Sequence, residues 1–450
     1  MKILFRFYFI ISFIVFSTAI TCAQTSTVVS PVGKDTKSGT AEEFPDVAPA
    51  AGWDNLRPAT AGKDNWPWWR GPALDNHSPA KNPPLNWSDQ MNVRWRLPLP
   101  GRGHASPCIR GDRIFLPAGD PTLEVVWMLC FDRATGRKLW QTEVYRGPFP
   151  KIHIDNSPAS ATPACDGERV YFPYQTAETI SMAALDLNGK VLWNKPVAPY
   201  KSIQGYSSSP ALYKSAIIIP VDGSVGNWLI ALHRQTGEVV WRSTTRKVLE
   251  GYASPLVTRV AGRDQVFIIG GLKTTSYDPN NGKMLWECDG PSDYCAATVA
   301  FSKETVYATG GVPQKALLAI RADGTGNVTA THLTWKSDNK AGYVPSPLLH
   351  EGLIYALSDN GLMRCYDAAT GQVVWEQNFK APFYSSPVLA GDRIYLFDRI
   401  GKGYVMKTGR QFELLATNEL PAGAFATPVI LGNRIYLRTL EDFFCLETKP

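Results

Sequence analysis

Two short segments of the chain carry side chains that can bind a polar ligand. The segments are GRGHASP and KIHIDNSPASATP, and their candidate binding residues are Arg102, His104, His153, Asp155 and Asn156. Imidazole, amide and carboxylate groups exchange hydrogen bonds with polar molecules, so this set suits a sugar, a peptide or another small polar ligand. A Ser-His-Asp triad cannot be assigned from scattered residues, and we therefore predict a binding site without catalytic residues.

The cysteines do not form a metal signature. The sequence contains no CxxC pair and no HExxH motif, so we predict no metal site. Cys130, Cys365 and Cys445 lie in apolar strands and are interpreted as small buried side chains. Cys288 and Cys295 bracket the segment ECDGPSDYC, and we hold open both a disulfide and two separate thiols there.

Repeated units must position these residues. The phrases SSPVLAGDRIYL and ATPVILGNRIYL begin 41 residues apart, and spacings of 40 to 56 residues separate eight similar openings. This period is typical of four-stranded propeller blades. The sequence predicts an all-β fold over residues 92–450, an eight-bladed β-propeller of four-stranded antiparallel blades. The openings lie at Pro107, Pro163, Pro210, Pro255, Thr298, Pro347, Pro387 and Pro428.

A glycine turn followed by a tryptophan recurs in most units, as in Thr370-Gly371 before Trp375. Glycine readily adopts the positive φ that closes such a turn. Small sheets must gain stability by stacking on their neighbours, and buried indoles suit that role. The predicted structural docking residues are Trp95, Trp140, Trp193, Trp241, Trp286, Trp335 and Trp375.

The two ends of the repeat region complement each other. The last unit stops after a third strand near residues 442–447, whereas residues 92–99, NVRWRLPL, look like a fourth strand with nothing ahead of it. If the N-terminal strand completes the last blade, the ring closes without a long unpaired edge. We therefore expect Trp95 to lie close to Phe443 and Phe444.

Residues just before each first strand of a propeller surround one mouth of its central channel. In addition to His104, aromatic residues hold these positions, namely Tyr206, Tyr252, Tyr294, Tyr343, Tyr384 and Phe425. Aromatic faces beside His, Asp and Asn predict a ligand site at this mouth. In an alternative that stays open, the tyrosines plug the channel and His104 and His153 bind turn carbonyls.

The phrase CYDAATGQVVW at residues 365–375 resembles the tryptophan-docking motif of quinoprotein alcohol dehydrogenases. The resemblance covers most of residues 92–447. The same repeat occurs in the propeller lipoprotein of the outer-membrane β-barrel assembly machine and in exported bacterial propellers called PQQ-like. WPWWRGP followed by GRGHASP looks most like this last group. The resemblance implies a propeller fold, but a fold does not fix a function.

Three functions are compatible with this resemblance. A family enzyme would need pyrroloquinoline quinone (PQQ), a calcium ion and an Asp base. Its alcohol dehydrogenases usually carry two adjacent cysteines, and this chain has no Cys-Cys pair. We therefore expect no cofactor and favour a non-enzymatic scaffold that binds a protein or glycan partner. The alternatives are a PQQ-dependent oxidoreductase acting on alcohols or sugars, and an outer-membrane protein assembly factor.

The chain begins with a pattern typical of export. Basic residues precede an apolar run, and Thr21-Cys22-Ala23 suits cleavage before Gln24, so we predict a signal peptide over residues 1–23. The apolar run is short for a bilayer span, so we expect a periplasmic or secreted protein without a transmembrane segment in the mature chain. The residues ending at Cys22 also allow a lipidation box, which would give an outer-membrane lipoprotein.

Two segments separate this signal from the repeats. Residues 24–62 are rich in small and polar residues and are predicted to form a disordered linker. Residues 63–91 contain several Trp among Pro, and we expect this lead-in to pack irregularly on the propeller. The net charge of +6 is scattered over turns, so we expect no nucleic-acid partner. We also expect a monomer.

Overall fold

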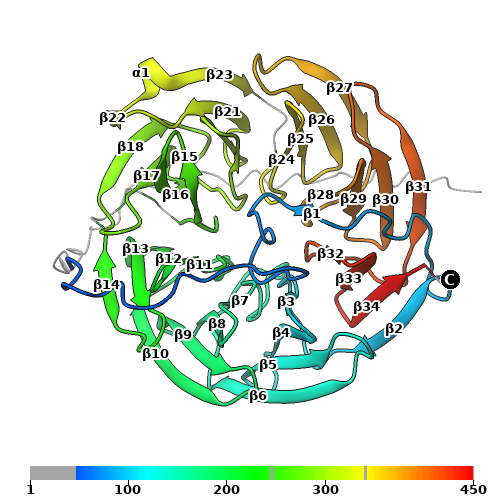
Figure 1. The fold of residues 1–450 in the computed structure, drawn as a ribbon, viewed down its shortest axis with the longest axis horizontal. Coiled ribbons are helices and arrows are strands. Elements are labelled where there is room, and N and C mark those ends of the chain that lie inside the picture. Colours follow the sequence, from blue (N-terminus) through cyan, green and yellow to red (C-terminus); the bar gives the residue numbers. More distant parts are fainter. Residues whose placement is uncertain (1–46, 244–245, 247, 249, 339–341, 449–450) are drawn as a thin grey trace, which may run out of the picture. The chain divides into compact units, whose positions relative to one another are not determined.

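Eight small sheets surround a central axis (Figure 1). The computed structural model describes residues 47–448 except 244, 245, 247, 249 and 339–341. These residues belong to one compact unit, Glu43–Pro450. The eight-bladed, all-β propeller expected from the repeats is confirmed. The predicted signal peptide and residues 24–46 of the predicted linker lie outside the described residues.

The first four blades follow the chain in order. Blade 1 contains β3 (Cys108–Arg110), β4 (Arg113–Asp120), β5 (Val125–Asp132) and β6 (Lys138–Arg146). Blade 2 contains β7 (Ala164–Cys165), β8 (Arg169–Gln175), β9 (Thr179–Asp186) and β10 (Val191–Pro199). Blade 3 contains β11 (Ala211–Tyr213), β12 (Ala216–Gly223), β13 (Gly226–His233) and β14 (Val239–Arg242). Blade 4 contains β15 (Leu256–Val260), β16 (Arg263–Gly270), β17 (Lys273–Tyr277) and β18 (Met284–Asp289).

The last four blades include two added strands and one short helix. Blade 5 contains β19 (Ala300–Phe301), β20 (Thr305–Gly310), β21 (Ala316–Arg321) and β23 (Leu333–Asp338). An insertion before β23 forms β22 (Gly326–Asn327), which pairs with β18, and helix α1 (Thr329–His332). Blade 6 contains β24 (Leu348–His350), β25 (Leu353–Leu357), β26 (Leu362–Asp367) and β27 (Val373–Asn378). Blade 7 contains β28 (Val388–Ala390), β29 (Arg393–Phe397), β30 (Lys402–Lys407) and β31 (Leu414–Glu419), with β1 (His77–Ser78) added at its inner edge.

Blade 8 is built from both ends of the propeller sequence. It contains β32 (Val429–Leu431), β33 (Arg434–Arg438), β34 (Asp442–Glu447) and β2 (Val93–Pro98). Strand β2 pairs antiparallel with β34, and Trp95 lies opposite Cys445. The ring centroids of Trp95 and Phe443 are 5.2 Å apart. The expected closure of the ring by the N-terminal strand is therefore confirmed.

In several blades, the turn before the outer strand is stabilised by its own side chains. In blade 1, the Thr135 backbone N–H and hydroxyl both donate to Asp132 Oδ1, at 2.8 and 2.7 Å. Gly136 follows with a φ of 75°, a conformation that costs a side-chain-bearing residue free energy. An added Cβ at Gly136 would lie 2.8 Å from the Trp95 ring. This turn therefore needs glycine both for its backbone and for contact with the neighbouring blade.

The same contact joins most successive blades. The indole Nε1 of Trp140 donates to the Leu187 carbonyl at 3.0 Å, while its ring lies against Gly189 of blade 2. Trp193, Trp241, Trp335 and Trp375 donate in the same way to carbonyls of the following blade. Because the contact repeats around much of the ring, most blades are held by a neighbour as well as by their own hydrogen bonds.

Trp286 departs from this pattern. Its Nε1 donates to Gln265 Oε1 at 2.9 Å within its own blade. The outer edge of β18 at this point is covered by β22, where Gly326 lies opposite Trp286. The insertion in blade 5 therefore takes the place of the docking turn.

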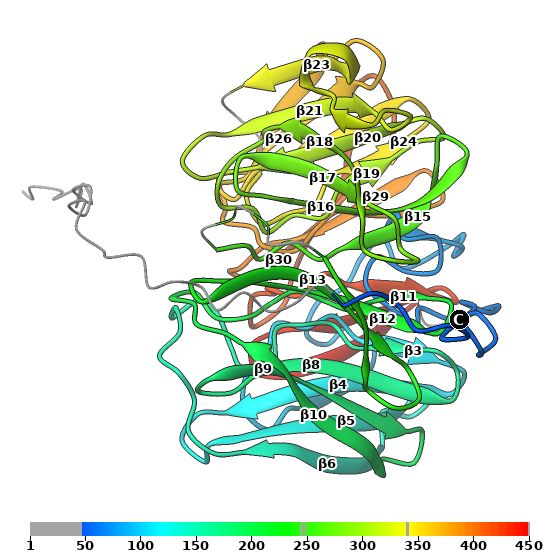
Figure 2. The same cartoon turned by 90° about the vertical axis from the view of Figure 1, so that its left-hand side faces the viewer.

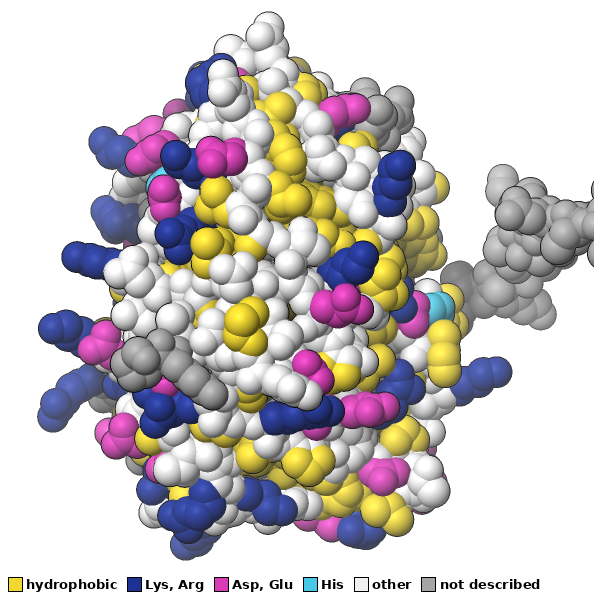
Figure 3. Space-filling view, turned by 90° about the vertical axis from the view of Figure 1, so that its right-hand side faces the viewer, with side chains coloured by type: hydrophobic (Ala, Val, Ile, Leu, Met, Phe, Trp, Pro, Cys, Tyr) yellow, Lys and Arg dark blue, Asp and Glu magenta, His cyan; other side chains and the backbone are white. Residues whose placement is uncertain are grey.

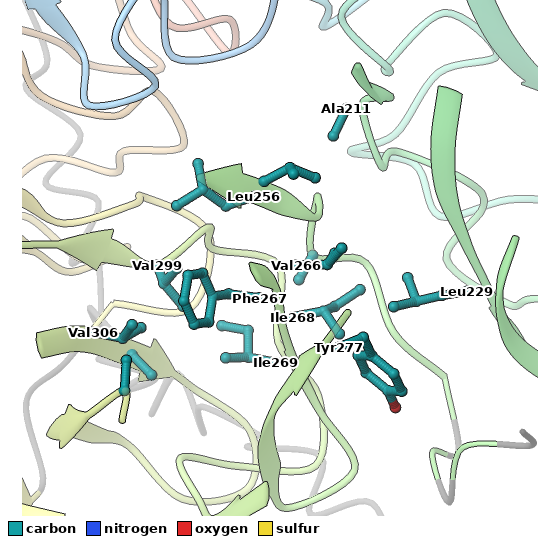
Figure 4. Close-up of a cluster of buried hydrophobic side chains, with 14 of the residues drawn as sticks. Ala211, Leu229, Leu256, Val266, Phe267, Ile268, Ile269, Tyr277, Val299 and Val306 are labelled. Atoms are coloured by element: carbon teal, nitrogen blue, oxygen red, sulfur yellow. The ribbon is translucent and has the colours of Figure 1, made fainter. Parts of the chain in front are cut away.

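Hydrophobic side chains fill the spaces between blades (Figure 4). One buried cluster includes Leu229 of blade 3, Phe267 of blade 4 and Val306 of blade 5. Since this core spans several sheets, removing one blade would expose apolar surface on both neighbours.

The Trp-rich lead-in crosses one end of the propeller, as Figures 1 and 2 show in blue. Trp66 forms an isolated bridge with Ile109 of blade 1, and its side chain is 2% exposed. Arg70 donates to the Pro347 carbonyl of blade 6 at 3.0 Å. Ser78 donates to the Ile430 carbonyl of blade 8 at 2.6 Å. The segment thus ties together blades that are far apart in the sequence.

Part of the predicted disordered linker is ordered on the propeller, which corrects the sequence prediction for residues 47–62. The Thr60 carbonyl accepts a hydrogen bond from Arg110 at 2.8 Å, and the Arg57 carbonyl accepts one from Arg234 at 2.5 Å. Asp54 lies 3.2 Å from Lys214. Arginine and lysine side chains of the blades bind polar groups of this segment. From the composition of the segment alone, these groups would be expected to be hydrated by water.

The candidate disulfide between Cys288 and Cys295 is absent from the structure, and both residues are buried free thiols. Each thiol has a nearby carbonyl acceptor instead. Cys288 Sγ lies 3.8 Å from the Asp289 carbonyl, and Cys295 Sγ lies 3.4 Å from the Ser292 carbonyl. Short spacing in the sequence therefore did not bring the two sulfur atoms together.

The described surface carries charges of both signs. On the face shown in Figure 3, basic and acidic side chains are interspersed with apolar ones. Within the described ranges, no helix is long and apolar enough to cross a membrane.

Candidate functional site

A cavity of about 330 Å³ occupies the channel at the mouth where the chain enters each innermost strand. Seven of the predicted site residues line it, namely His104, His153, Asp155, Asn156, Tyr252, Tyr343 and Tyr384. Phe425 lines it as well. These side chains belong to connections between different blades, so the ring closure brings them together.

Three predicted site residues do not line this cavity. Arg102 is exposed and forms a backbone bridge with Gly119. Tyr206 is buried, and its hydroxyl donates to the Pro220 carbonyl at 3.1 Å. Tyr294 forms a backbone bridge with Val312. For Tyr206, the alternative of a packing role describes the structure better than the binding role.

A ring of hydroxyl side chains, the hydroxyl belt, surrounds the channel beneath the mouth. Its members precede the first strand of each blade and are Ser106, Thr162, Ser209, Ser254, Thr298, Ser346, Ser386 and Thr427. At six steps, the backbone N–H of one member donates to the hydroxyl of the next, at 2.8 to 3.0 Å. The small residue at each opening therefore links neighbouring blades and gives the cavity a polar wall.

One residue of the lead-in, Trp69, lines this cavity. Its Nε1 donates to the hydroxyl of Thr298 at 2.8 Å. The composition of the lead-in predicts only packing on the propeller, because nothing in it shows that one indole reaches the channel.

Arg399 forms the cationic part of the mouth. It is not among the site residues predicted from the sequence. Its guanidinium carbon lies 4.1 Å from the centre of the Tyr384 ring and 4.5 Å from that of Phe425. Its Nη2 pairs with Asp155 Oδ1 at 2.7 Å. Tyr384 also donates to Asp155 Oδ2 at 3.3 Å. A single arginine in a strand-to-strand turn gives no sequence signal, and only the fold places it against two aromatic rings.

His104 continues this stack. Its ring lies 4.6 Å from that of Phe425, with 14° between the planes. Burial, together with the positive charges of Arg438, Arg102 and Arg399, lowers the pKa of His104 to about 3. The imidazole is therefore neutral at pH 7. Its Nε2 is buried and has no hydrogen-bond partner among the described residues.

The connection between blades 1 and 2 holds the other predicted polar residues. His153 Nδ1 accepts the Asp155 backbone N–H at 3.2 Å. Asn156 Nδ2 donates to the Gln204 carbonyl at 2.6 Å, and its Oδ1 accepts the Ser160 hydroxyl at 2.6 Å. These contacts order the turn that presents Asp155.

The acidic groups nearest the tyrosines are held by the protein itself. Tyr252 donates to Glu250 Oε2 at 2.5 Å, and burial raises the pKa of its phenol. Asp359 accepts the backbone N–H groups of Tyr343 and Val344 at 2.8 and 3.0 Å. These carboxylates therefore stabilise the wall of the mouth.

The arrangement is suited to binding. Ser160 Oγ lies 3.5 Å from His104 Nδ1 but donates to Asn156, so its proton is not directed at the imidazole. A serine activated by histidine would need that hydrogen bond. Aromatic rings, one guanidinium and a belt of hydroxyls instead offer stacking, charge and hydrogen bonds to a ligand.

The blade number, the docking tryptophans and the channel mouth define a PQQ-like β-propeller. Residues 88–212 and 324–439, more than half of the chain, match the family described as outer membrane protein assembly factor BamB. The chain belongs to this family.

Known relatives include both assembly factors and dehydrogenases. The BamB assembly factor of Yersinia pestis is 21% identical over 345 residues, which cover 76% of this chain and 72% of that protein. A polyvinylalcohol dehydrogenase of a Pseudomonas species is 25% identical over 203 residues, 41% of this chain and only 30% of the dehydrogenase. The crystal structure of a quinohemoprotein alcohol dehydrogenase from Comamonas testosteroni has a TM-score of 0.63 at 14% identity, with 88% of this chain and 83% of that chain covered. At this identity, the likeness concerns the fold alone.

The described residues do not present the donor set expected for a quinone with calcium. No three His, Cys, Asp or Glu side chains gather as a metal site in this part of the chain. None of the residues lining the channel cavity is a cysteine. We therefore derive no chemical step through a quinone or a metal ion.

Proposed function

We propose that this protein is an exported, non-enzymatic propeller scaffold that binds a protein partner with the loops around the channel mouth. Similarity to assembly factors of the outer membrane supports a role in the cell envelope, and the narrower role in outer-membrane protein assembly is part of the proposal. Between the protein and glycan partners expected from the sequence, the surface around the mouth favours a protein.

The observation that carries this proposal is a group of exposed apolar side chains at one end of the propeller, here called the apolar rim. Strands alternate in direction within a blade, so the turn between its second and third strands lies at the same end as the connection to the next blade. Seven of the twelve large apolar side chains exposed among the described residues lie on these loops. They are Leu123, Ile154, Ile203, Val225, Leu272, Val312 and Ile400.

The most exposed members of the apolar rim are Ile154, Ile203 and Ile400, at 75%, 70% and 63%. Apolar groups held in water on several neighbouring loops are typical of surfaces that bind proteins. A sugar partner would instead favour exposed polar groups beside aromatic rings. The remaining five exposed apolar residues lie at or next to the start of outer strands, at the other end of the blades.

Site-specific photo-crosslinking in the exporting cell tests the proposal. A photoreactive phenylalanine at Ile154, Ile203 or Ile400 should give a common protein adduct. The matched controls are Met284 and Val373, which are also exposed and apolar but lie at the start of outer strands. Adducts that form equally at both sets of positions, or at neither, would contradict binding through the channel mouth.

Quinone-dependent oxidation of an alcohol or sugar is the second candidate. It is favoured by the sequence similarity to a polyvinylalcohol dehydrogenase and by the aromatic lining of the channel. Saturable binding of PQQ together with dye reduction by alcohols would support it over the scaffold role.

A further inference from the structure

The contact between Asp155 and Arg399 resembles a ligand site that is occupied by the protein's own carboxylate. We propose that the channel mouth binds a carboxylate side chain of an acidic, otherwise apolar peptide segment, and that Asp155 holds this position when no peptide is bound. The inference rests on the protein-binding role proposed above and adds the chemistry of the partner.

Arg399 is a preorganised receptor for a carboxylate. The rings of Tyr384 and Phe425 lie 4.1 and 4.5 Å from its guanidinium carbon and restrict its orientation. A guanidinium binds a carboxylate best through two parallel hydrogen bonds. Asp155 pairs with Nη2, whereas the adjacent Nε is buried and has no hydrogen-bond partner among the described residues. A carboxylate that approaches along this edge would satisfy both nitrogen atoms.

His104 adds a second unsatisfied donor or acceptor to the same wall. Its ring stacks on Phe425, on which Arg399 also lies. Its Nε2 is buried without a partner. His104 and Arg399 both contact Phe425, which lines the cavity, so this wall carries two nitrogen atoms that lack a partner among the described residues and that a bound ligand would satisfy.

The charges around this wall favour an added anion. Glu250 and Asp359 already accept hydrogen bonds from the protein, as described above. Arg438 is 1% exposed and donates to the Pro117 carbonyl, with no ion pair within the described part of the chain. Its positive charge acts on His104 together with that of Arg399. Asp155 thus pairs with Arg399, which is 20% exposed, and the buried Arg438 adds a second positive charge near His104.

Asp155 can leave this position at low cost. Its side chain is 31% exposed, and it is carried by the connection between blades 1 and 2, whereas Arg399 lies in blade 7. A partly exposed ion pair between separate loops contributes little to stability. A ligand carboxylate can therefore replace it without disturbing the blades.

The flanking residues identify the ligand as a peptide. Ile154 precedes Asp155 and Ile400 follows Arg399, and both are largely exposed. Each side of the ion pair thus carries an apolar contact at the surface. A peptide with apolar residues around an acidic one fits this pattern, whereas an acidic sugar offers no comparable apolar side chains.

Two pools of synthetic hexapeptides test the inference on the immobilised mature protein. Both pools are acetylated and amidated, with one central Glu or one central Gln and randomised apolar or small residues elsewhere. Mass spectrometry of the retained peptides should show the Glu pool enriched about tenfold over the Gln pool. D155N should increase retention of the Glu pool, because the internal competitor is removed, and R399Q should reduce it to that of the Gln pool.

The control variant is R410Q, which breaks a different exposed Arg–Asp contact, that of Arg410 with Asp367 at 3.1 Å. It should leave retention unchanged. An increase in the retention of the Glu pool by D155N could not be explained by misfolding of the variant.

Three outcomes would overturn the inference. They are equal retention of both pools, weaker retention by D155N, and displacement of the Glu pool by galacturonate at concentrations where acetate has no effect, which would assign the site to an acidic sugar. The cross-linking experiment above tests the binding face separately, so failure of the carboxylate inference does not imply failure of the scaffold role.

Discussion

The indole of Trp193 in blade 2 lies directly against Gly237 of blade 3. A Cβ added at Gly237 would come within 2.8 Å of the indole ring, and Trp193 Nε1 donates to the Arg234 carbonyl at 3.2 Å. The same relationship joins Trp140 to Gly189. At most junctions of the propeller, a tryptophan of one blade thus contacts a turn of the next.

Gly237→Ala should destabilise the protein more than Gly262→Ala. Both glycines have positive φ, 73° and 75°, so alanine causes similar backbone strain at each. Only Gly237 has a neighbour close to the new Cβ, whereas Gly262 has none within 4 Å. We expect the free energy of unfolding to fall by about 1–3 kcal/mol more for Gly237→Ala. Urea denaturation of the two variants checks this, and equal losses would contradict the docking contact.

Trp95→Ala should weaken the closure of the ring. Trp95 is 8% exposed and packs on Phe443 of the last blade. Loss of a large buried aromatic side chain costs about 3–5 kcal/mol. We expect this decrease in the free energy of unfolding, and a smaller one for Trp95→Phe, which keeps an aromatic ring. A loss below about 1 kcal/mol for Trp95→Ala would show that β2 contributes little to closure.

His104 should make the stability depend on pH. Its pKa is lowered to about 3 in the folded protein, so the unfolded chain, with a His pKa of about 6.5, takes up a proton first as the pH falls. Stability is therefore lost between about pH 6.5 and pH 3. From about pH 7 to pH 5, His104 should account for about 2 kcal/mol of this loss.

His104→Phe checks this pH dependence, because phenylalanine can still stack on Phe425 but does not titrate. Denaturation at the two pH values should show a smaller decrease for the variant than for the wild type. An identical decrease would mean that His104 is protonated at similar pH in both states.

Addition of PQQ and calcium should produce no saturable binding and no dye reduction with alcohols or sugars. The expectation rests on the lack of a fitting donor set among the described residues. Isothermal titration calorimetry and a dye-coupled assay measure the two properties. Binding together with turnover would establish the dehydrogenase alternative and displace the scaffold role.

The blade architecture was predictable because it follows from local sequence patterns that repeat along the chain. The spacing of the openings, the turn at Gly371 and the tryptophan at Trp375 each reflect a short-range requirement of strands and hairpins. Closure by the strand that carries Trp95 was also predictable, since the last unit lacks a fourth strand and an unpartnered fourth strand precedes the first unit.

Other expectations failed where contacts depend on distant residues. The linker prediction missed order in residues 47–62, because Arg110 and Arg234 of the blades bind its carbonyls. Cys288 and Cys295 are close in sequence, yet their thiols face different carbonyls. These interactions cannot be inferred from the composition of a segment or from the spacing of its residues.

The sequence by itself determined that the repeats form eight blades, and it predicted that aromatic residues precede the first strand of most blades. Only the tertiary structure decided which of those residues face the cavity, and it placed Asp155 of one connection against Arg399 of another. The physical reason is that strands and turns follow from neighbours along the chain. The wall of a channel, in contrast, is assembled from separate blades whose side chains meet only after the ring has closed.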